Sequence, residues 1–252
     1  MSTKKRVVPN FEMRKWRAEF LQDLSTIHPL IPDNKKNVAL ELGNKKTGTH
    51  GRFFNSVFVW NLPSVVTCPC ASRWCLCHCY NADSRSDVFP IDIWKTNWWM
   101  SINEPERLKD NIVDQIKKAQ SPSAVRLHSS GDFYSTEYIE MWYKISTELP
   151  ETKFWTYTRS WVDDKLREAL NKLQVLNNFE IFGSWDSSMG LVLPPTHWRW
   201  SYVQEVHNND TEVQGLHRKS LICPEQTERL NSCADCAFCL RAINKDIIFY
   251  FH

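Results

Sequence analysis

The residues in this sequence best suited to chemistry are its nine cysteines, because they fall into two tight groups. The first group has five cysteines in the twelve residues from Cys68 to Cys79. The second consists of Cys223 and the series Cys233-x2-Cys236-x2-Cys239. Thiols that fill a core as small apolar residues occur singly, whereas thiols separated by short gaps suit a soft metal centre that needs several sulfurs from one loop. The spacing therefore predicts metal binding.

The second group has the spacing of an iron–sulfur site. Cys233, Cys236 and Cys239 can place three thiolates on one face of a cubane 4Fe–4S cluster, and Cys223, which precedes Pro224, can supply the fourth. A four-thiolate zinc site has the same number of ligands and is the alternative. Zinc ribbons pair two separated Cys-x2-Cys units, however, and do not use three cysteines in series. The series therefore favours a cluster over zinc.

In the first group, Cys68, Cys75 and Cys79 have the spread to wrap a cluster. Cys70 and Cys77 are alternates or extra ligands. The sequence leaves open whether there are two separate clusters or one cluster that takes cysteines from both groups. Disulfides are disfavoured, because the basic, Pro-interrupted N-terminus does not resemble a signal peptide. We therefore expect a cytoplasmic protein, in the host cytoplasm if the protein is viral.

The composition is that of an ordinary globular protein, with 24% charged and 42% hydrophobic residues. The 252 residues suffice for one large domain, and we expect an N-terminal extension over 1–50 and a single α/β iron–sulfur domain over 51–252. No apolar run is long enough to span a bilayer, so no membrane partner is expected. The net charge of +2 gives no positive evidence for nucleic acid, and a small-molecule or nucleic-acid partner stays open.

Strands that alternate with helices must position the cysteines. A strand over 56–61 leads into the first group, and two helices follow, one over 91–100 and one after Pro105. Three strand and helix units come next, with strands at 124–128, 153–158 and 179–183. Further strands are expected within 198–206, 219–222 and 247–250, and a short amphipathic helix between Phe11 and Leu24. This alternation predicts a parallel sheet.

Polar residues follow three successive strands of this expected sheet. They are His128, Ser129, Ser130 and Asp132 after the first, Thr158 and Arg159 after the second, and Ser184 and Asp186 after the third. The carboxyl ends of parallel strands share one edge, so we expect these residues to converge on the edge that carries Cys68 to Cys79. The alternative is that Asp132 and Asp186 only cap helices or order turns.

Several of these motifs together resemble the bacteriophage gene product 88 family, over most of residues 40–252. The motifs are Thr67-Cys68-Pro69, Cys75-x3-Cys79-Tyr80, the stretches 126–134 and 154–160, a Ser and Asp strand end, and a terminal Phe-x-x-His.

More distantly, the order of parts resembles the radical S-adenosylmethionine (SAM) enzymes. The resemblance implies a partial (β/α) barrel of parallel strands, with an N-terminal extension and a Cys-rich C-terminal tail. It further implies that Ser130 and Asp132 would hold the amino group of SAM, while Arg159 and Asp186 would face SAM or substrate. The usual Cys-x3-Cys-x2-Cys loop is replaced here by gaps of six and three residues if Cys68, Cys75 and Cys79 are the ligands. The extra cysteines could fill the open iron position, which would abolish SAM binding.

Three functions therefore stay open, and whether the protein is an enzyme stays open with them. The first is a non-catalytic protein that binds one or two 4Fe–4S clusters. The second is a radical SAM enzyme that cleaves SAM. The third is a binding module stabilised by zinc.

Overall fold

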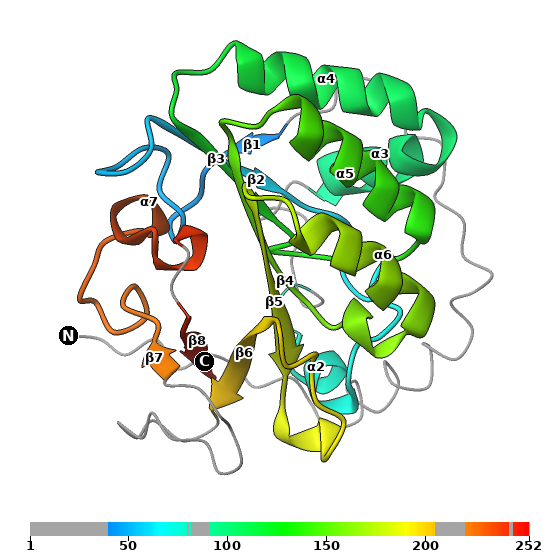
Figure 1. The fold of residues 1–252 in the computed structure, drawn as a ribbon, viewed down its shortest axis with the longest axis vertical. Coiled ribbons are helices and arrows are strands. Elements are labelled where there is room, and N and C mark those ends of the chain that lie inside the picture. The colour runs from blue at the N-terminus through cyan, green and yellow to red at the C-terminus, as the bar shows by residue number, and fades with distance from the viewer. Residues whose placement is uncertain (1–39, 80, 82–90, 205–219, 242–243, 252) are drawn as a thin grey trace.

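The fold is known from a computed structural model, which describes residues 40–79, 81, 91–204, 220–241 and 244–251. The helix expected between Phe11 and Leu24 lies outside these residues. At the centre is an eight-stranded sheet in the order β1-β2-β3-β4-β5-β6-β8-β7 (Figure 1). All neighbouring strands are parallel except β1, which runs antiparallel to β2. The strands are β1 (Glu41–Leu42), β2 (Ser56–Trp60), β3 (Ser123–Leu127), β4 (Lys153–Thr158), β5 (Phe179–Trp185), β6 (Arg199–Gln204), β7 (Ser220–Ile222) and β8 (Asp246–Tyr250).

Four longer helices cover one face of the sheet (Figure 1). They are α3 (Ile91–Asn103), α4 (Pro105–Lys117), α5 (Thr136–Glu148) and α6 (Asp164–Gln174). Each has apolar residues at helical spacing, as in α4, where Leu108, Ile112 and Ile116 are buried. Three short helical segments contain cysteines: α2 (Arg73–Cys77), α7 (Cys233–Cys236) and the 3-10 turn η4 (Phe238–Leu240). Two further 3-10 turns, η2 (Ser160–Val162) and η3 (Ser187–Met189), follow the ends of β4 and β5.

The expectation of an α/β fold with a mostly parallel sheet is confirmed, and each expected strand has a counterpart within a few residues. The short strand β1 was not expected. Among the described strands, β1 and β7 are the two edges, so the sheet is open. The partial barrel stays a prediction.

Residues alternate between the two faces of the sheet, as the pleat requires. Phe58, Trp60 and Phe154 pack into the large core beneath the helices. Val57 and Trp155 instead pack on the opposite face, against the C-terminal cysteine segment. We call this opposite side the inner face. All five residues of β2 are buried, because the sheet is covered on both sides there.

The strand order explains why the C-terminal cysteines lie on the inner face. From β2 to β6 each strand is added on the same side of its predecessor, and right-handed crossovers put α3 to α6 on one face. The step from β7 to β8 runs back the other way, since β8 lies between β6 and β7. A right-handed connection for that step must cross the opposite face, and α7 and η4 lie there (Figure 1).

The first described residues are hydrogen-bonded to the C-terminal cysteine segment. Cys233 N donates to Lys46 O at 2.9 Å, and Ala234 N donates to Thr47 O at 2.9 Å. The division into an extension over 1–50 and a domain over 51–252 stays a prediction. Among the helices that the structure describes, none combines the length and apolar character that a membrane crossing requires.

Candidate metal centres

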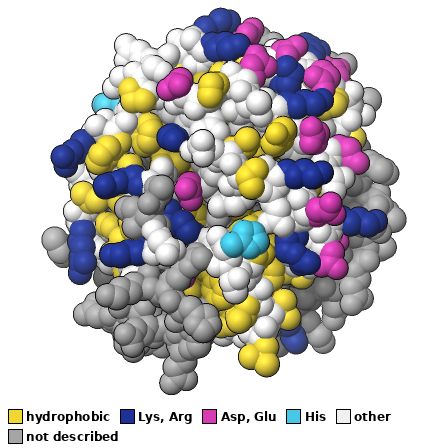
Figure 2. Space-filling view, viewed as in Figure 1, with side chains coloured by type: hydrophobic (Ala, Val, Ile, Leu, Met, Phe, Trp, Pro, Cys, Tyr) yellow, Lys and Arg dark blue, Asp and Glu magenta, His cyan; other side chains and the backbone are white. Residues whose placement is uncertain are grey.

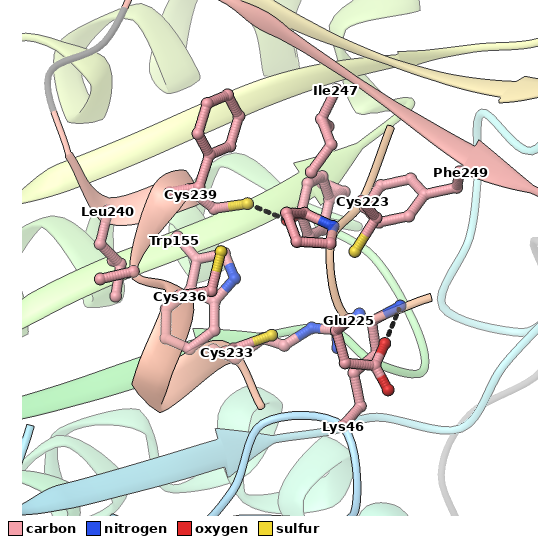
Figure 3. Close-up of a pocket in the computed structure, with 15 residues that line it drawn as sticks. Lys46, Trp155, Cys223, Glu225, Cys233, Cys236, Cys239, Leu240, Ile247 and Phe249 are labelled. Carbon is pink, nitrogen blue, oxygen red and sulfur yellow. Dashed lines mark hydrogen bonds and ion pairs between the residues drawn. The ribbon is translucent and has the colours of Figure 1, made fainter. Parts of the chain in front are cut away.

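The four cysteines of the second group line one cavity on the inner face, and we call them the C-terminal group. Cys223, Cys233, Cys236 and Cys239 bring their sulfurs around a common space (Figure 3). Cys223 directly follows β7, and its N–H continues the ladder to Ile248 O at 2.9 Å. The other three lie on α7 and η4. Four thiols around one space is the ligand number of a cubane cluster and also of a four-thiolate zinc site.

Local hydrogen bonds shape the turn that carries three of these thiols. Ser232 caps α7 by accepting a bond from Asp235 N at 3.2 Å. Ala237 has a φ of 48°, and this left-handed residue ends α7 so that the chain turns back into η4. The backbone N–H of Arg52 also donates to Asp235 Oδ1 in this turn, at 3.1 Å. These contacts hold Cys233, Cys236 and Cys239 on the cavity side of the turn.

Cations surround the C-terminal group. Lys46 and Arg126 line the cavity, and both favour the thiolate of Cys233. Glu225 also lines it, pairs with Lys46 at 3.3 Å and acts in the opposite sense. Arg241 acts in the same sense on Cys236, and Arg199 on Cys239. In the space-filling view, Lys and Arg side chains gather on the side of the molecule where the loops around α7 lie (Figure 2). A centre of four thiolates is negatively charged, so these cations complement it.

One side chain of the sheet touches a cysteine of this group directly. The hydroxyl of Tyr157 on β4 donates to Cys239 Sγ at 2.8 Å. Burial raises the pKa of Tyr157 well above its ordinary value, so the hydroxyl keeps its proton. Burial also raises the pKa of the Cys233 thiol to about 11 and raises that of Cys239. Thiolates at these positions therefore need a positive partner such as a metal.

The first group lies elsewhere, where α2 follows the carboxyl end of β2. Ser72 caps α2 by accepting a hydrogen bond from Cys75 N at 3.0 Å. The Ser72 hydroxyl itself donates to Asp186 Oδ2. Trp74 N donates to Ser188 Oγ at 3.3 Å. The end of β5 thus anchors the helix that carries Cys75.

Arg159 and Asp186 form a buried ion pair beneath this loop. Arg159 Nη2 lies 3.0 Å from Asp186 Oδ2, and the two side chains are 14% and 2% exposed. Burial opposes ionisation of Asp186, but bonds from Ser188 and Ser72 and the charge of Arg159 lower its pKa overall. Asp186 also caps η3, as the capping alternative expected. It therefore remains a carboxylate that holds Arg159 and Ser72 together.

Asp132 ties the ends of β3 and β4 to each other. Its carboxylate accepts bonds from Phe133 N at 2.8 Å, Thr158 Oγ1 at 2.5 Å and Arg159 N at 2.9 Å. Burial raises its pKa, against the effect of these bonds. The helix cap that the capping alternative assigned to Asp132 is made by Ser135, which accepts from Tyr138 N.

The loop after β3 packs closely on the first cysteine loop. Leu62 N donates to Ser130 O at 3.0 Å, and Asp132 N donates to Thr67 O at 3.1 Å. Gly131 has a φ of +82°, and a Cβ there would lie 2.6 Å from Leu62 Cβ and 2.7 Å from Thr67 Oγ1. Only glycine fits this position. The Ser130 hydroxyl is buried and has no hydrogen-bond partner among the described residues.

Three of the five thiols in the first group act on one another, and we call them the loop group. Burial, the Asp132 carboxylate and the thiols of Cys79 and Cys75 raise the pKa of Cys68 well above its ordinary value. Burial also raises the pKa of Cys75, and Arg159 opposes this effect. Cys70 lies by the backbone of Asp163 and packs on the helix-side core. The choice of Cys68, Cys75 and Cys79 over Cys70 and Cys77 stays a prediction.

The end of β8 touches the surroundings of both groups. The Phe249 ring lies against Tyr157, with the centroids 5.1 Å apart. Two residues later, the Phe251 ring packs on Trp74 in the first turn of α2 and on His78 just after that helix, with centroid distances of 5.2 and 5.0 Å. The end of the chain therefore contacts both the lining of the C-terminal cavity and the helix that carries Cys75.

The structure separates two of the polar residues that were expected at the strand ends. His128 lies toward the helices, with Nε2 2.9 Å from the Tyr138 hydroxyl, and burial lowers its pKa to about 3. Ser184 pairs its hydroxyl with Ser201 at 3.0 Å. Asp132, Thr158, Arg159 and Asp186 are joined in one network with Ser72.

Sequence reasoning missed Lys46, Ser72 and Tyr157. Ser72 stands three residues before Cys75, which is the spacing of a helix cap, and this signal was available. Tyr157 lies two residues after Trp155 on β4, which places both side chains on one face, but nothing local indicates that this face meets a cysteine.

In the described residues, no three or more His, Cys, Asp or Glu side chains are gathered closely enough to hold a single metal ion.

Comparison with known proteins gives one family and two relatives. The sequence model described as "Gene product 88" matches residues 32–242. The "Gene 88 protein" of Mycobacterium phage D29 is 22% identical over 200 residues, which cover 73% of this chain and 81% of that protein. The protein of the same name from Mycobacterium phage L5 is 20% identical over 199 residues, with the same coverage. No solved structure matches the chain.

Proposed function

Because this chain belongs to the gene product 88 family, we propose a function from its cysteine sites: it binds 4Fe–4S clusters in two separate centres of one α/β domain. The C-terminal group would hold one cluster through Cys223, Cys233, Cys236 and Cys239. The loop group would hold the other through Cys68, Cys75 and Cys79. The sheet would take the form of a partial barrel.

The observation that carries this proposal is the convergence of four thiols on one cavity. They come from two segments, Cys223 after β7 and the turn of α7 and η4, and line one space together. Four cysteines that served only as core residues would have no reason to share a cavity with Lys46 and Arg126. Buried thiols next to cations fit a centre that replaces four protons with metal.

A cluster accounts for the Cys-x2-Cys-x2-Cys series better than zinc does. In a cubane cluster each thiolate binds a different iron, so three ligands in series can reach one face. Zinc needs all its sulfurs about 2.3 Å from a single ion. A zinc-stabilised binding module is therefore the weaker alternative.

Anaerobic purification followed by visible spectroscopy tests the proposal. Thiolate-bound iron absorbs in the visible range and zinc does not, so the protein should be brown, with a broad shoulder that dithionite bleaches. A colourless protein with stoichiometric zinc would rule the cluster out.

A radical SAM enzyme is the second candidate, and the loop group is what favours it. The Cys68 thiol, on which the thiols of Cys75 and Cys79 act, lies in the loop after β2. The unpartnered Ser130 hydroxyl and the Asp132 carboxylate lie in the loop after β3. When bound, a reduced cluster supplies one electron to SAM. Arg159 and Asp186 would orient the ligand. Asp132 already accepts three protein hydrogen bonds, which leaves it little capacity for the ammonium of SAM.

Calorimetry with SAM on the reconstituted protein separates the two candidates. The non-catalytic proposal expects no detectable heat of binding. Saturable binding that is lost in Ser130→Ala would favour the enzyme. A small-molecule or nucleic-acid partner stays a prediction under either candidate.

A further inference from the structure

Tyr157 is held firmly where its hydroxyl meets Cys239. The bond from the hydroxyl to Sγ is 2.8 Å long. The ring packs against Phe182 and Phe249, with both centroid distances 5.1 Å. The guanidinium of Arg126 stands 5.6 Å from the ring centroid. Packing therefore fixes the ring, and the ring does not need the hydroxyl to stay in place.

A hydrogen bond to a cluster sulfur acts differently on the two oxidation states. Reduction adds one electron, so the thiolates of the reduced centre carry more negative charge. A donor binds more strongly to a more charged acceptor, and burial strengthens the difference. Hydrogen bonds to the sulfurs and the net charge around the centre are among the properties that set the potential of iron–sulfur clusters.

We propose that Tyr157 raises the reduction potential of the centre held by the C-terminal group, through a hydrogen bond to Cys239 Sγ that strengthens when the centre is reduced. In this step the centre takes one electron from an external one-electron donor. No bond is broken, and the hydroxyl keeps its proton in both states. The inference rests on the proposed cluster and deepens it, because it assigns that centre a redox function.

The surrounding cations also favour the reduced state and so raise the reduction potential, as the Tyr157 hydrogen bond does. Lys46 and Arg126 line the cavity, while Arg199 lies over the rings of Phe182 and Phe238 at 4.3 and 5.0 Å. Lys46 pairs with Glu225, which also lines the cavity, and Arg199 pairs with Glu180, so these carboxylates offset part of the effect. Tyr157 acts on one sulfur, so its contribution can be removed without a change in charge.

Redox titration of Tyr157→Phe in the full-length chain tests the proposal. The variant keeps the ring and loses the donor. We expect its iron and sulfide content to be unchanged and the equilibrium constant for reduction to fall about three- to tenfold, where tenfold equals 59 mV for one electron. Cys75→Ser, made in parallel, assigns the signals, since those of the C-terminal centre should persist in it.

Tyr134→Phe is the matched control. Tyr134 also loses a hydroxyl bond, to Ser101 Oγ at 2.7 Å, but it packs against the helix-side core and does not line the cavity. Its potential should equal that of the wild type.

Each other outcome overturns the proposal. An unchanged potential in Tyr157→Phe with full iron content would mean that the hydroxyl only fastens the turn to β4. Loss of iron from Tyr157→Phe would mean that it holds the centre and does not tune it. An equal shift in Tyr134→Phe would show a general effect of the fold. Wild type without iron and sulfide would overturn the proposed function first, and this inference with it.

Discussion

At the scale of single residues, Asp132 is a buried carboxylate whose oxygens accept hydrogen bonds from three protein groups. Such a residue is hard to replace. Three donors converge on its two oxygens, one each from the backbone of Phe133 and Arg159 and one from Thr158. An asparagine has one acceptor oxygen, and its NH₂ group would face a donor. The position therefore depends on both acceptor oxygens.

We expect Asp132→Asn to lower the free energy of unfolding by about 1.5–3 kcal/mol, the range for hydrogen bonds to charged groups. Urea denaturation measures it. Ser135→Ala, which removes only the cap of α5, should cost about 1 kcal/mol. If Asp132→Asn cost no more than a few tenths of a kcal/mol, the network would not be the reason for this carboxylate.

His128 predicts a pH dependence of stability. Burial lowers its pKa to about 3 from 6.5, so the folded state keeps the ring neutral while the unfolded chain takes up a proton. Stability from this residue is complete above pH 6.5 and is lost as pH falls toward 3. The slope should be about 1.4 kcal/mol per pH unit across that window.

The difference between wild type and His128→Asn isolates this effect from other titrating groups. Asparagine tolerates the left-handed backbone at this position, where φ is 61°. The variant should lose the slope of one proton between pH 6 and 4. Parallel stability curves for the two proteins would show that His128 does not titrate on unfolding.

At the scale of elements, the decisive connection is the one between α2 and the end of β5. Ser72 accepts from Cys75 N and donates to Asp186, so one hydroxyl caps the helix and anchors it. Groups that orient metal ligands in this way typically contribute 10–100-fold to metal affinity.

Ser72→Ala should therefore weaken iron binding at the loop group about 10–100-fold and leave the C-terminal group loaded. Competition with an iron chelator, followed by iron analysis, measures the loss. Ser135→Ala is the control, since it removes a similar cap from α5. Equal iron retention in the two variants would contradict the anchoring role.

The same scale shows what the sequence could and could not predict. Apolar periodicity located α4 to α6 and the strands β2 to β5, because each pattern is local. The position of the C-terminal group on the inner face was not predictable, since it follows from β8 inserting between β6 and β7. No local pattern encodes that order. The contacts of Lys46 and Tyr157 with the C-terminal group depend on it, so they were missed as well.

The cysteine assignments show the same limit within one loop. Gaps alone left Cys70 and Cys77 as alternates to Cys68, Cys75 and Cys79. In the structure Cys70 lies by the backbone of Asp163, which follows β4 and is remote in sequence, so no local pattern could indicate this neighbour. Which of the five thiols bind metal stays a prediction. Of the polar strand ends, Asp132, Arg159 and Asp186 do lie in one network, because parallel strands bring their carboxyl ends to one edge. His128 and Ser184 instead bond to Tyr138 and Ser201, partners that no local pattern indicates.

At the scale of the whole molecule, the C-terminal group joins parts of the chain that are far apart in sequence. The turn of α7 and η4 is hydrogen-bonded to the backbone of Lys46 and Thr47. Its cysteines share the cavity with Cys223, which follows β7, and with Trp155 and Tyr157 of β4. A metal bound there would close these segments over the inner face. Its binding energy would then be folding energy.

We expect Cys233→Ser and Cys236→Ser each to lose the C-terminal cluster and to melt at a lower temperature than the wild type. Thermal unfolding under anaerobic conditions measures this. Cys70→Ser is the control, since Cys70 is outside both proposed ligand sets. A melting temperature equal to that of the control would mean that the centre does not support the fold.

The most direct test of two separate iron–sulfur centres is quantitative analysis of iron, sulfide and zinc in the anaerobically reconstituted protein and in one variant of each group. We predict about eight iron and eight sulfide per wild-type chain, and about four of each in both Cys75→Ser and Cys236→Ser, because each variant would lose one cubane cluster. About four iron in the wild type, lost entirely in either variant, would show a single shared cluster. Stoichiometric zinc without sulfide would contradict the account altogether.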